Sequence, residues 1–183
     1  MAGGTDILIA VRLALDWTFE NYPNGESFGG AKEQLQKTFP PDAETDDYPQ
    51  TLTLAGGDAN QMWRDRRFVT TGSTTDDLDL SGSLTNVFGE TVSFSTIRAL
   101  IIHNRATVVG DDLDVGGAAA NPLTSIHDGS GTAKYTIRAS GIDFKWAPLD
   151  GYAVSGGSAD TLRITHAGST EAIYYDIVII GTE

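Results

Sequence analysis

The last third of the chain, residues 151–181, constrains the fold more than any other stretch, because short apolar runs alternate there with glycine-rich turns. Two of these runs, 161–165 and 173–180, have the β-branched and aromatic composition that is typical of strands. The run Ile177–Ile180 is apolar at every position, which indicates a strand covered on both faces. The stretch therefore predicts strand, turn, strand, turn and a long central strand, and it holds no pattern typical of a reaction site.

The same alternation extends back to about residue 63. Gly, Asn, Asp and Ser separate the apolar runs at a spacing of roughly 8–12 residues, which is typical of a sandwich or barrel of short strands. The predicted strands are 68–71, 77–80, 91–103, 107–109, 133–138, 142–146, 152–155, 161–165 and 173–180. Within 91–103 the apolar side chains change face, which indicates a bulge or short turn near Ser95 and Thr96. Because no helical pattern separates the strands, we predict an all-β fold, a jelly-roll-like antiparallel β-sandwich, over residues 63–183.

Residues 1–62 lack the regular strand pattern of the rest of the chain and hold four of its six prolines. Strict alternation from Ile7 to Leu15 predicts a strand, and the segment Ala31–Phe39, stopped by Pro40 and Pro41, predicts a helix of about two turns. We interpret the whole segment as an extended N-terminal arm. That these residues instead add edge strands to the main sheet is equally compatible with the pattern.

Charge and composition exclude several classes of function. The net charge of −13 would repel a phosphate backbone and an anionic bilayer, so we expect neither a nucleic-acid partner nor a membrane partner. The absence of cysteine excludes disulfides and thiolate metal sites. No stretch approaches the roughly 20 apolar residues of a membrane span, and the first residues lack the basic region of a signal peptide. We expect the protein to act inside the cell that makes it or in a particle assembled there.

Motifs for chemistry are missing from the sequence. The histidines, His103, His127 and His166, are far apart, and neither a nucleophile elbow nor a phosphate-binding loop is present. Two aspartate-rich segments, 76–79 and 111–114, could supply oxygen ligands to calcium, but neither matches a calcium-loop motif. The alternative is an ordinary strand with its aspartates in water. We therefore expect no enzymatic activity, no metal and no cofactor.

Basic residues gather at one place in this acidic chain. Arg64, Arg66 and Arg67 lie between Trp63 and Phe68, and arginine and aromatic residues are enriched in protein interfaces. These residues predict a patch that meets carboxylates of a neighbouring copy or partner. The alternative is pairing within the chain, with Asp65 and with the run 76–79.

Four blocks of the sequence are distinctive: 63–68 (WRDRRF), 77–89, 94–104 and the glycine-punctuated strands of 151–181. Together they resemble small virion structural proteins of tailed bacteriophages. The resemblance covers residues 60–183 and implies a β-sandwich, no enzymatic activity, and symmetric multimers on a capsid or tail. Residues before 60 match no family that we can place.

The resemblance and the charge together favour a capsid decoration, or cement, protein. Such a protein would sit on the capsid surface of the virion, bind the major capsid protein, and form a homo-oligomer, most simply a trimer at threefold positions. In the arm, Trp17, Phe19, Tyr22 and Phe28 are the candidate anchors, and Trp63, Arg64, Arg66 and Arg67 are the candidates in the sandwich. The arm's aromatic residues could equally pack on the chain's own core, which we favour for Trp17.

Two other functions stay open. One is a tail, baseplate or receptor-binding component. The other is a carbohydrate-binding sandwich, for which Tyr135, Trp146 and Tyr152 could form an aromatic platform, although Trp146 is expected to plug the sandwich instead.

Overall fold

The computed structural model describes residues 59–70, 74–86, 89–127, 129–168 and 172–183 with their side chains, and the backbone of four short strands before residue 54. Every regular element in these residues is a β-strand, and every pair of strands is antiparallel. The chain is therefore all-β, as the sequence predicts. It divides into two compact units, one of Leu8–Ala55 and one that includes Gly56–Glu183. Among the described residues, no helix is long and apolar enough to cross a membrane.

In the smaller unit, the described residues form two strand pairs. Strand β1 (Ala10–Val11) pairs with β4 (Leu52–Thr53), and β2 (Leu15–Phe19) pairs with β3 (Glu33–Lys37). The helix predicted over 31–39 is therefore wrong at 33–37. A helix of nine residues is marginal in water because its nucleation is costly, whereas β3 gains a cross-strand partner at each of its five positions.

The single strand predicted over 7–15 is not one described element. Its residues contribute to β1 and to the first position of β2, and 12–14 lie outside the described residues.

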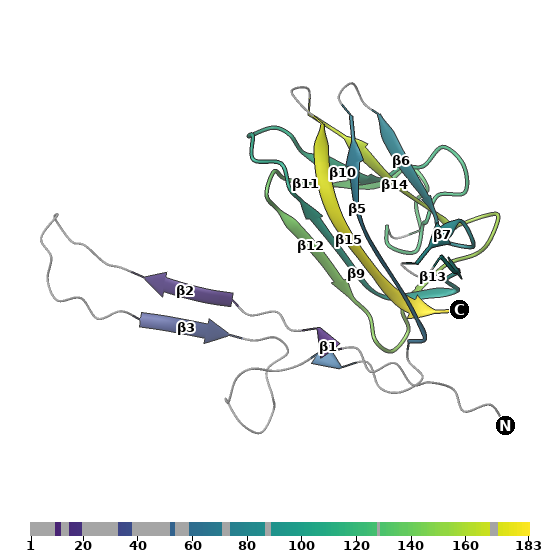
Figure 1. The fold of residues 1–183 in the computed structure, drawn as a ribbon, viewed down its shortest axis with the longest axis horizontal. Coiled ribbons are helices and arrows are strands. Elements are labelled where there is room, and N and C mark those ends of the chain that lie inside the picture. The colour runs from purple at the N-terminus through teal and green to yellow at the C-terminus, as the bar shows by residue number, and fades with distance from the viewer. Residues whose placement is uncertain are drawn as a thin grey trace, which may run out of the picture. The chain divides into compact units, whose positions relative to one another are not determined.

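The structure describes eleven strands in the larger unit, most of which are labelled in Figure 1. They are β5 (Gln61–Val69), β6 (Thr75–Asp79), β7 (Leu84–Thr85), β8 (Thr91–Val92), β9 (Thr96–Asn104), β10 (Leu113–Gly116), β11 (Lys134–Ile137), β12 (Ile142–Trp146), β13 (Tyr152–Ala153), β14 (Thr161–His166) and β15 (Ile173–Thr182). One sheet has the order β12-β9-β15-β5, with β13 also on β9, and the other has the order β11-β10-β14-β6. Strands β7 and β8 form a separate hairpin.

The strand order follows one simple rule. If the eight strands of the two main ladders are numbered along the chain, the first (β5) pairs with the eighth (β15), and the second (β6) pairs with the seventh (β14). The third (β9) pairs with the sixth (β12), and the fourth (β10) with the fifth (β11). The eight strands therefore form four antiparallel pairs that are nested along the chain, and successive pairs belong alternately to the two sheets.

Side chains of both sheets share one hydrophobic core. Strand β15 lies between β9 and β5, so the central position predicted for this apolar run is confirmed. Ile177 and Ile179 point into the core, while Ile180 is buried on the opposite side of the strand. From the other sheet, Leu162 and Ile164 enter the same core. The coverage of both faces that the sequence predicts holds only in part, because Ile180 is buried on the outward side whereas Val178 on the same side is half-exposed.

Two strand predictions change in the structure. Residues 107–109 do not form a strand; a turn over 108–111 is closed by a hydrogen bond from the Asp111 N–H to the Val108 carbonyl at 3.2 Å, and Val109 is 97% exposed. The change of face in β9 is real but lies at Arg98, the residue left over where the register with β15 shifts at Ile180/Gly181. There β9 passes so close to Gly181 that a Cβ would lie 1.9 Å from the Thr96 carbonyl oxygen.

Candidate interaction surface

Strand β5 divides the arginine cluster between two faces of its sheet. Trp63 points inward, is 3% exposed, and donates its indole N–H to the Thr85 carbonyl at 3.1 Å, so it is not on the surface. The exposed Arg64 and Arg66 alternate with inward positions and therefore point outward. Arg67 points toward the core side and is half-buried.

Arg67 joins the two sheets at their edge strands. Its guanidinium donates to both carboxylate oxygens of Asp76 on β6, at 2.5 and 2.8 Å, and the Tyr175 hydroxyl of β15 donates to the same carboxylate at 2.7 Å. Arg67 also reaches Asp65 at 3.2 Å. Pairing within the chain, the alternative that the sequence left open, is therefore the arrangement of Arg67.

The environment of this clamp changes the pKa of its members. Burial acts to raise the pKa of Asp76, but the hydrogen bonds from Arg67 and Tyr175 outweigh it and hold that pKa below its usual value. Burial, followed by the hydrogen bond to Asp76, raises the pKa of Tyr175 well above its usual value. The clamp is therefore an ionised carboxylate held between one cation and one neutral hydroxyl.

Arg66 takes part in a second charge cluster, on the opposite face of the sheet. Asp176 accepts hydrogen bonds from Arg66 at 2.7 Å and from Arg105 at 2.8 Å, and His103 Nδ1 lies 3.9 Å from it. The hydrogen bond from Arg66 is the main reason that the pKa of Asp176 is lowered. Two arginines thus share one carboxylate, which leaves the cluster with net positive charge.

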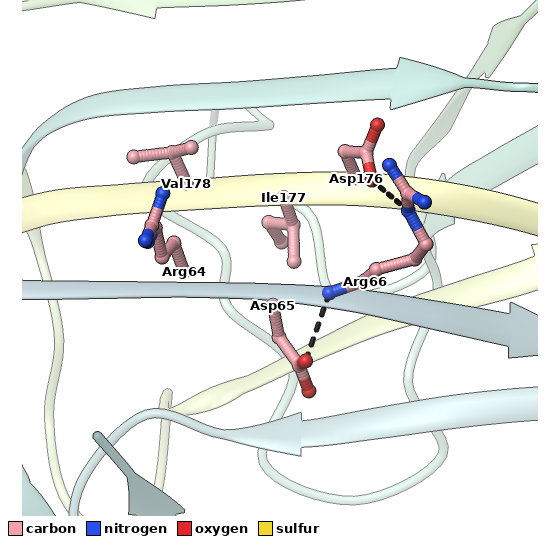
Figure 2. Close-up of a pocket in the computed structure, with 6 residues that line it drawn as sticks. All are labelled: Arg64, Asp65, Arg66, Asp176, Ile177 and Val178. Carbon is pink, nitrogen blue, oxygen red and sulfur yellow. Dashed lines mark hydrogen bonds and ion pairs between the residues drawn. The ribbon is translucent and has the colours of Figure 1, made fainter. Parts of the chain in front are cut away.

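Arg64 is exposed and forms no hydrogen bond or ion pair with any residue that the structure describes. It lines a hollow of about 500 Å³ with Asp65 and Arg66 of β5 and with Asp176, Ile177 and Val178 of β15. Figure 2 shows Arg64 beside Val178 at one end of this hollow and the Arg66–Asp176 hydrogen bond at the other. The hollow therefore offers one uncompensated cation beside an apolar wall.

Apolar side chains continue across the sheet from Arg64. The strand register places Arg64, Val178, Ile101 and Phe144 in one cross-strand row. The next row holds Met62, Ile180, Ala99 and Trp146. We call these two rows, together with Arg66, Asp176, His103 and Arg105, the outer face. It combines arginine and apolar side chains, the composition that is enriched in protein interfaces.

The aspartate-rich segments pair with donors of the protein itself. On β6, Asp77 accepts two hydrogen bonds from Arg163, at 2.6 and 2.7 Å, and Asp79 accepts from Ser81 and Ser83. In the other segment, Asp112 pairs with Arg138 and Asp114 with Lys134. Among the described residues no group of three or more acidic or histidine side chains is placed to hold a metal ion.

The three histidines occupy three separate environments. His103 lies on the outer face, and His127 lies beside the ring of Tyr135, with 5.4 Å between ring centroids. His166 is 1% exposed, with Nε2 3.7 Å from Asp111 Oδ1. A substrate cannot reach that pair without opening the core.

The three aromatic residues of the hypothetical sugar platform do not share a surface. Tyr135 and Tyr152 pack against the core, and the Tyr135 hydroxyl donates to Asp143 at 2.6 Å. Trp146 lies on the outer face, stacked on Phe144 with 6.2 Å between ring centroids. The expectation that Trp146 plugs the core is wrong, because Trp63 is the tryptophan in the core cluster.

The predicted anchors of the arm lie mostly beyond what the structure describes. Trp17 and Phe19 are part of β2, where Trp17 is the register partner of Leu35, but only the backbone is described there. Tyr22 and Phe28 lie outside the described residues.

Comparison with known proteins finds no matching family model, no matching curated protein and no matching solved structure. Any functional argument for this chain therefore depends on its own residues.

Proposed function

We propose that this chain is a non-enzymatic virion structural protein, a capsid decoration or cement protein that binds the major capsid protein of a phage head as a symmetric multimer, most simply a trimer. The observation that carries the proposal is the outer face. On this face of an acidic chain, Arg64, Arg66 and Met62 are exposed beside the half-buried apolar side chains of Val178, Ile101, Phe144 and Trp146.

The proposal includes a finer description of the fold, a jelly-roll sandwich over residues 63–183 with an N-terminal arm over residues 1–62. The pairing of first with eighth, second with seventh, third with sixth and fourth with fifth strand supports it, because two interleaved Greek keys of eight strands produce that order. Double-sheet jelly rolls occur in viral capsid domains and in lectins.

In this proposal the arm adds contact area that a single sheet face lacks. Trp17, Phe19, Tyr22 and Phe28 would anchor it on the shell or on a neighbouring copy. Ordering an arm costs conformational entropy, so binding would depend on how well these few aromatic residues fit rather than on the length of the arm. The protein would act on the capsid surface, with neither nucleic acid nor membrane as partner and without a cofactor.

Cosedimentation of the full chain with purified head shells tests this function. We expect the chain to pellet with shells at a fixed ratio of copies. Binding that persists at about 1 M salt would assign the contact to apolar anchors, and binding lost in salt would assign it to arginine–carboxylate pairs. A chain that stays in the supernatant with saturating shells, or that pellets with purified tails instead, contradicts the head assignment.

A carbohydrate-binding or receptor-binding role is the second candidate, and the stacked Phe144–Trp146 pair on the outer face is the observation that favours it. Aromatic faces are a common platform for sugar rings. Binding to a glycan array that disappears in Trp146→Ala would favour this role, and an array without signal would remove it.

A further inference from the structure

We infer that the outer face around Arg64 is the docking surface for a second copy of this chain, which inserts its Leu149–Asp150 loop tip against Arg64 and the neighbouring apolar side chains. This inference rests on the proposed multimeric function, and it names the two surfaces that would form the contact. It makes the contact heterologous, with different surfaces of the two copies meeting each other.

The receiving surface has one charge that finds no partner among the described residues. Every other lysine and arginine whose side chain the structure describes contacts a carboxylate or, for Arg98, a backbone carbonyl. Arg64 contacts neither, and it stands beside the hollow of about 500 Å³. Met62 and Val178 flank it, and Met62 is 44% exposed. A ligand that fits must bring a carboxylate and an apolar group close together.

The loop that follows β12 has both of those groups at its tip. Leu149 is 86% exposed, and the exposed Asp150 forms no hydrogen bond or ion pair with any residue in the part of the chain that the structure describes. Arg98 donates to the Leu149 carbonyl, and Gly151 closes the turn at φ +70°. The tip is therefore held in place before any partner arrives, which lowers the entropic cost of binding.

The two surfaces cannot satisfy each other within one copy. The loop leaves β12 and Arg64 lies on β5, with β9 and β15 between them, so three strand spacings of about 4.8 Å separate their strands by roughly 14 Å. Contact between two outer faces is electrostatically unfavourable, because Arg64, Arg66 and Arg105 against Asp176 leave each face with positive charge. A contact between the loop of one copy and the Arg64 side of the next repeats in one direction, and it forms a ring when the rotation from copy to copy closes, as the proposed symmetric multimer requires.

Sedimentation velocity of the full chain over a concentration series tests the contact. We expect the wild type to form a closed oligomer, and Arg64→Ala to raise its dissociation constant roughly tenfold. Arg138→Ala is the control, because it removes an arginine whose side chain is 82% exposed next to β11 of the other sheet, and it should leave the oligomer unchanged. Circular dichroism of each variant checks that the fold is retained.

A charge exchange identifies the pair itself. Arg64→Asp alone and Asp150→Arg alone should each dissociate the oligomer, and the double variant should restore it. A monomeric wild type, single variants that associate normally, or a double variant that fails to reassociate would each overturn the inference. None of these results decides shell binding, which the cosedimentation experiment measures separately, so the two proposals can fail independently.

Discussion

The clamp between Arg67, Asp76 and Tyr175 should contribute more stability than any other described ion pair, and Asp76→Ala removes it. The substitution deletes two hydrogen bonds from Arg67 and one from the Tyr175 hydroxyl. Because Tyr175 is fully buried, leaving its hydroxyl without an acceptor costs about 1–3 kcal/mol. The Arg67 side chain is 34% exposed and can regain water, so its share is at most about 1 kcal/mol.

The expected loss is therefore about 3 kcal/mol in the free energy of unfolding, or a fall of about 6–12 °C in Tm for a chain of this size. Urea unfolding followed by far-ultraviolet circular dichroism measures it. The adjacent Asp77→Ala is the matched control, because Asp77 also binds an arginine through two hydrogen bonds but is 41% exposed. We expect that control to lose at most about 1 kcal/mol.

Tyr175→Phe should fall between these two variants, because it removes one hydrogen bond and leaves the ion pair in place; its cost is about 1 kcal/mol. Equal effects of Asp76→Ala and Asp77→Ala would refute the reasoning. In that case burial at the sheet edge would not strengthen the pair, and the clamp would be an ordinary surface interaction.

Three further changes test other parts of the structure. Stability should decline as the pH falls below about 4, because the pKa of Asp76 is lower in the folded than in the unfolded state. The stability that ionised Asp76 contributes is complete above its unfolded-state pKa and is lost as the pH falls through its folded-state pKa. Tm measured from pH 7 to pH 2 should therefore fall less steeply in Asp76→Ala than in the wild type. Gly181→Ala should lower Tm by several degrees because its Cβ would meet the Thr96 carbonyl, whereas Gly156→Ala, with only ordinary contacts at 3.5 Å, should change it little. Trp63→Phe should cost about 1–2 kcal/mol in urea unfolding, since it leaves a gap in the core and removes the hydrogen-bond donor of the Thr85 carbonyl; a cost below about 0.5 kcal/mol would contradict the role of Trp63 as a core anchor.

The class of fold was predictable because period-2 alternation survives wherever one face of a strand is polar. The pattern identified β12, β14 and β15 within a few residues. It failed at β5, of which only the last residues were predicted, because charged side chains occupy four consecutive positions in the middle of a half-buried edge strand. At 33–37 the sequence favours a helix locally, and only pairing with β2 decides for a strand.

The candidate surface was predictable in part. The sequence drew attention to Arg64, Arg66 and Arg67, but it could not assign each of them to a face of the sheet. A shift of one residue in the strand register moves every side chain to the opposite face. It gave no sign of Asp176, which lies 110 residues from Arg66 and meets it only through the pairing of β5 with β15. Pairing between strands so far apart in the sequence leaves no local signal of which residues meet. The one local sign is that Asp176, a charged residue beside the apolar run of β15, must face outward.

The pairing of β5 with β15 also decides how the larger unit would respond to mechanical load. Gln61 lies opposite Gly181, and the Glu183 N–H donates to Asn60 Oδ1 at 2.9 Å. A force that pulls residues 60 and 183 apart therefore acts across the hydrogen bonds between β5 and β15 and breaks them one after another, beginning at Gln61. Tension along that direction should peel the unit open at low force, whereas the same ladder pulled lengthwise would have to rupture many hydrogen bonds together.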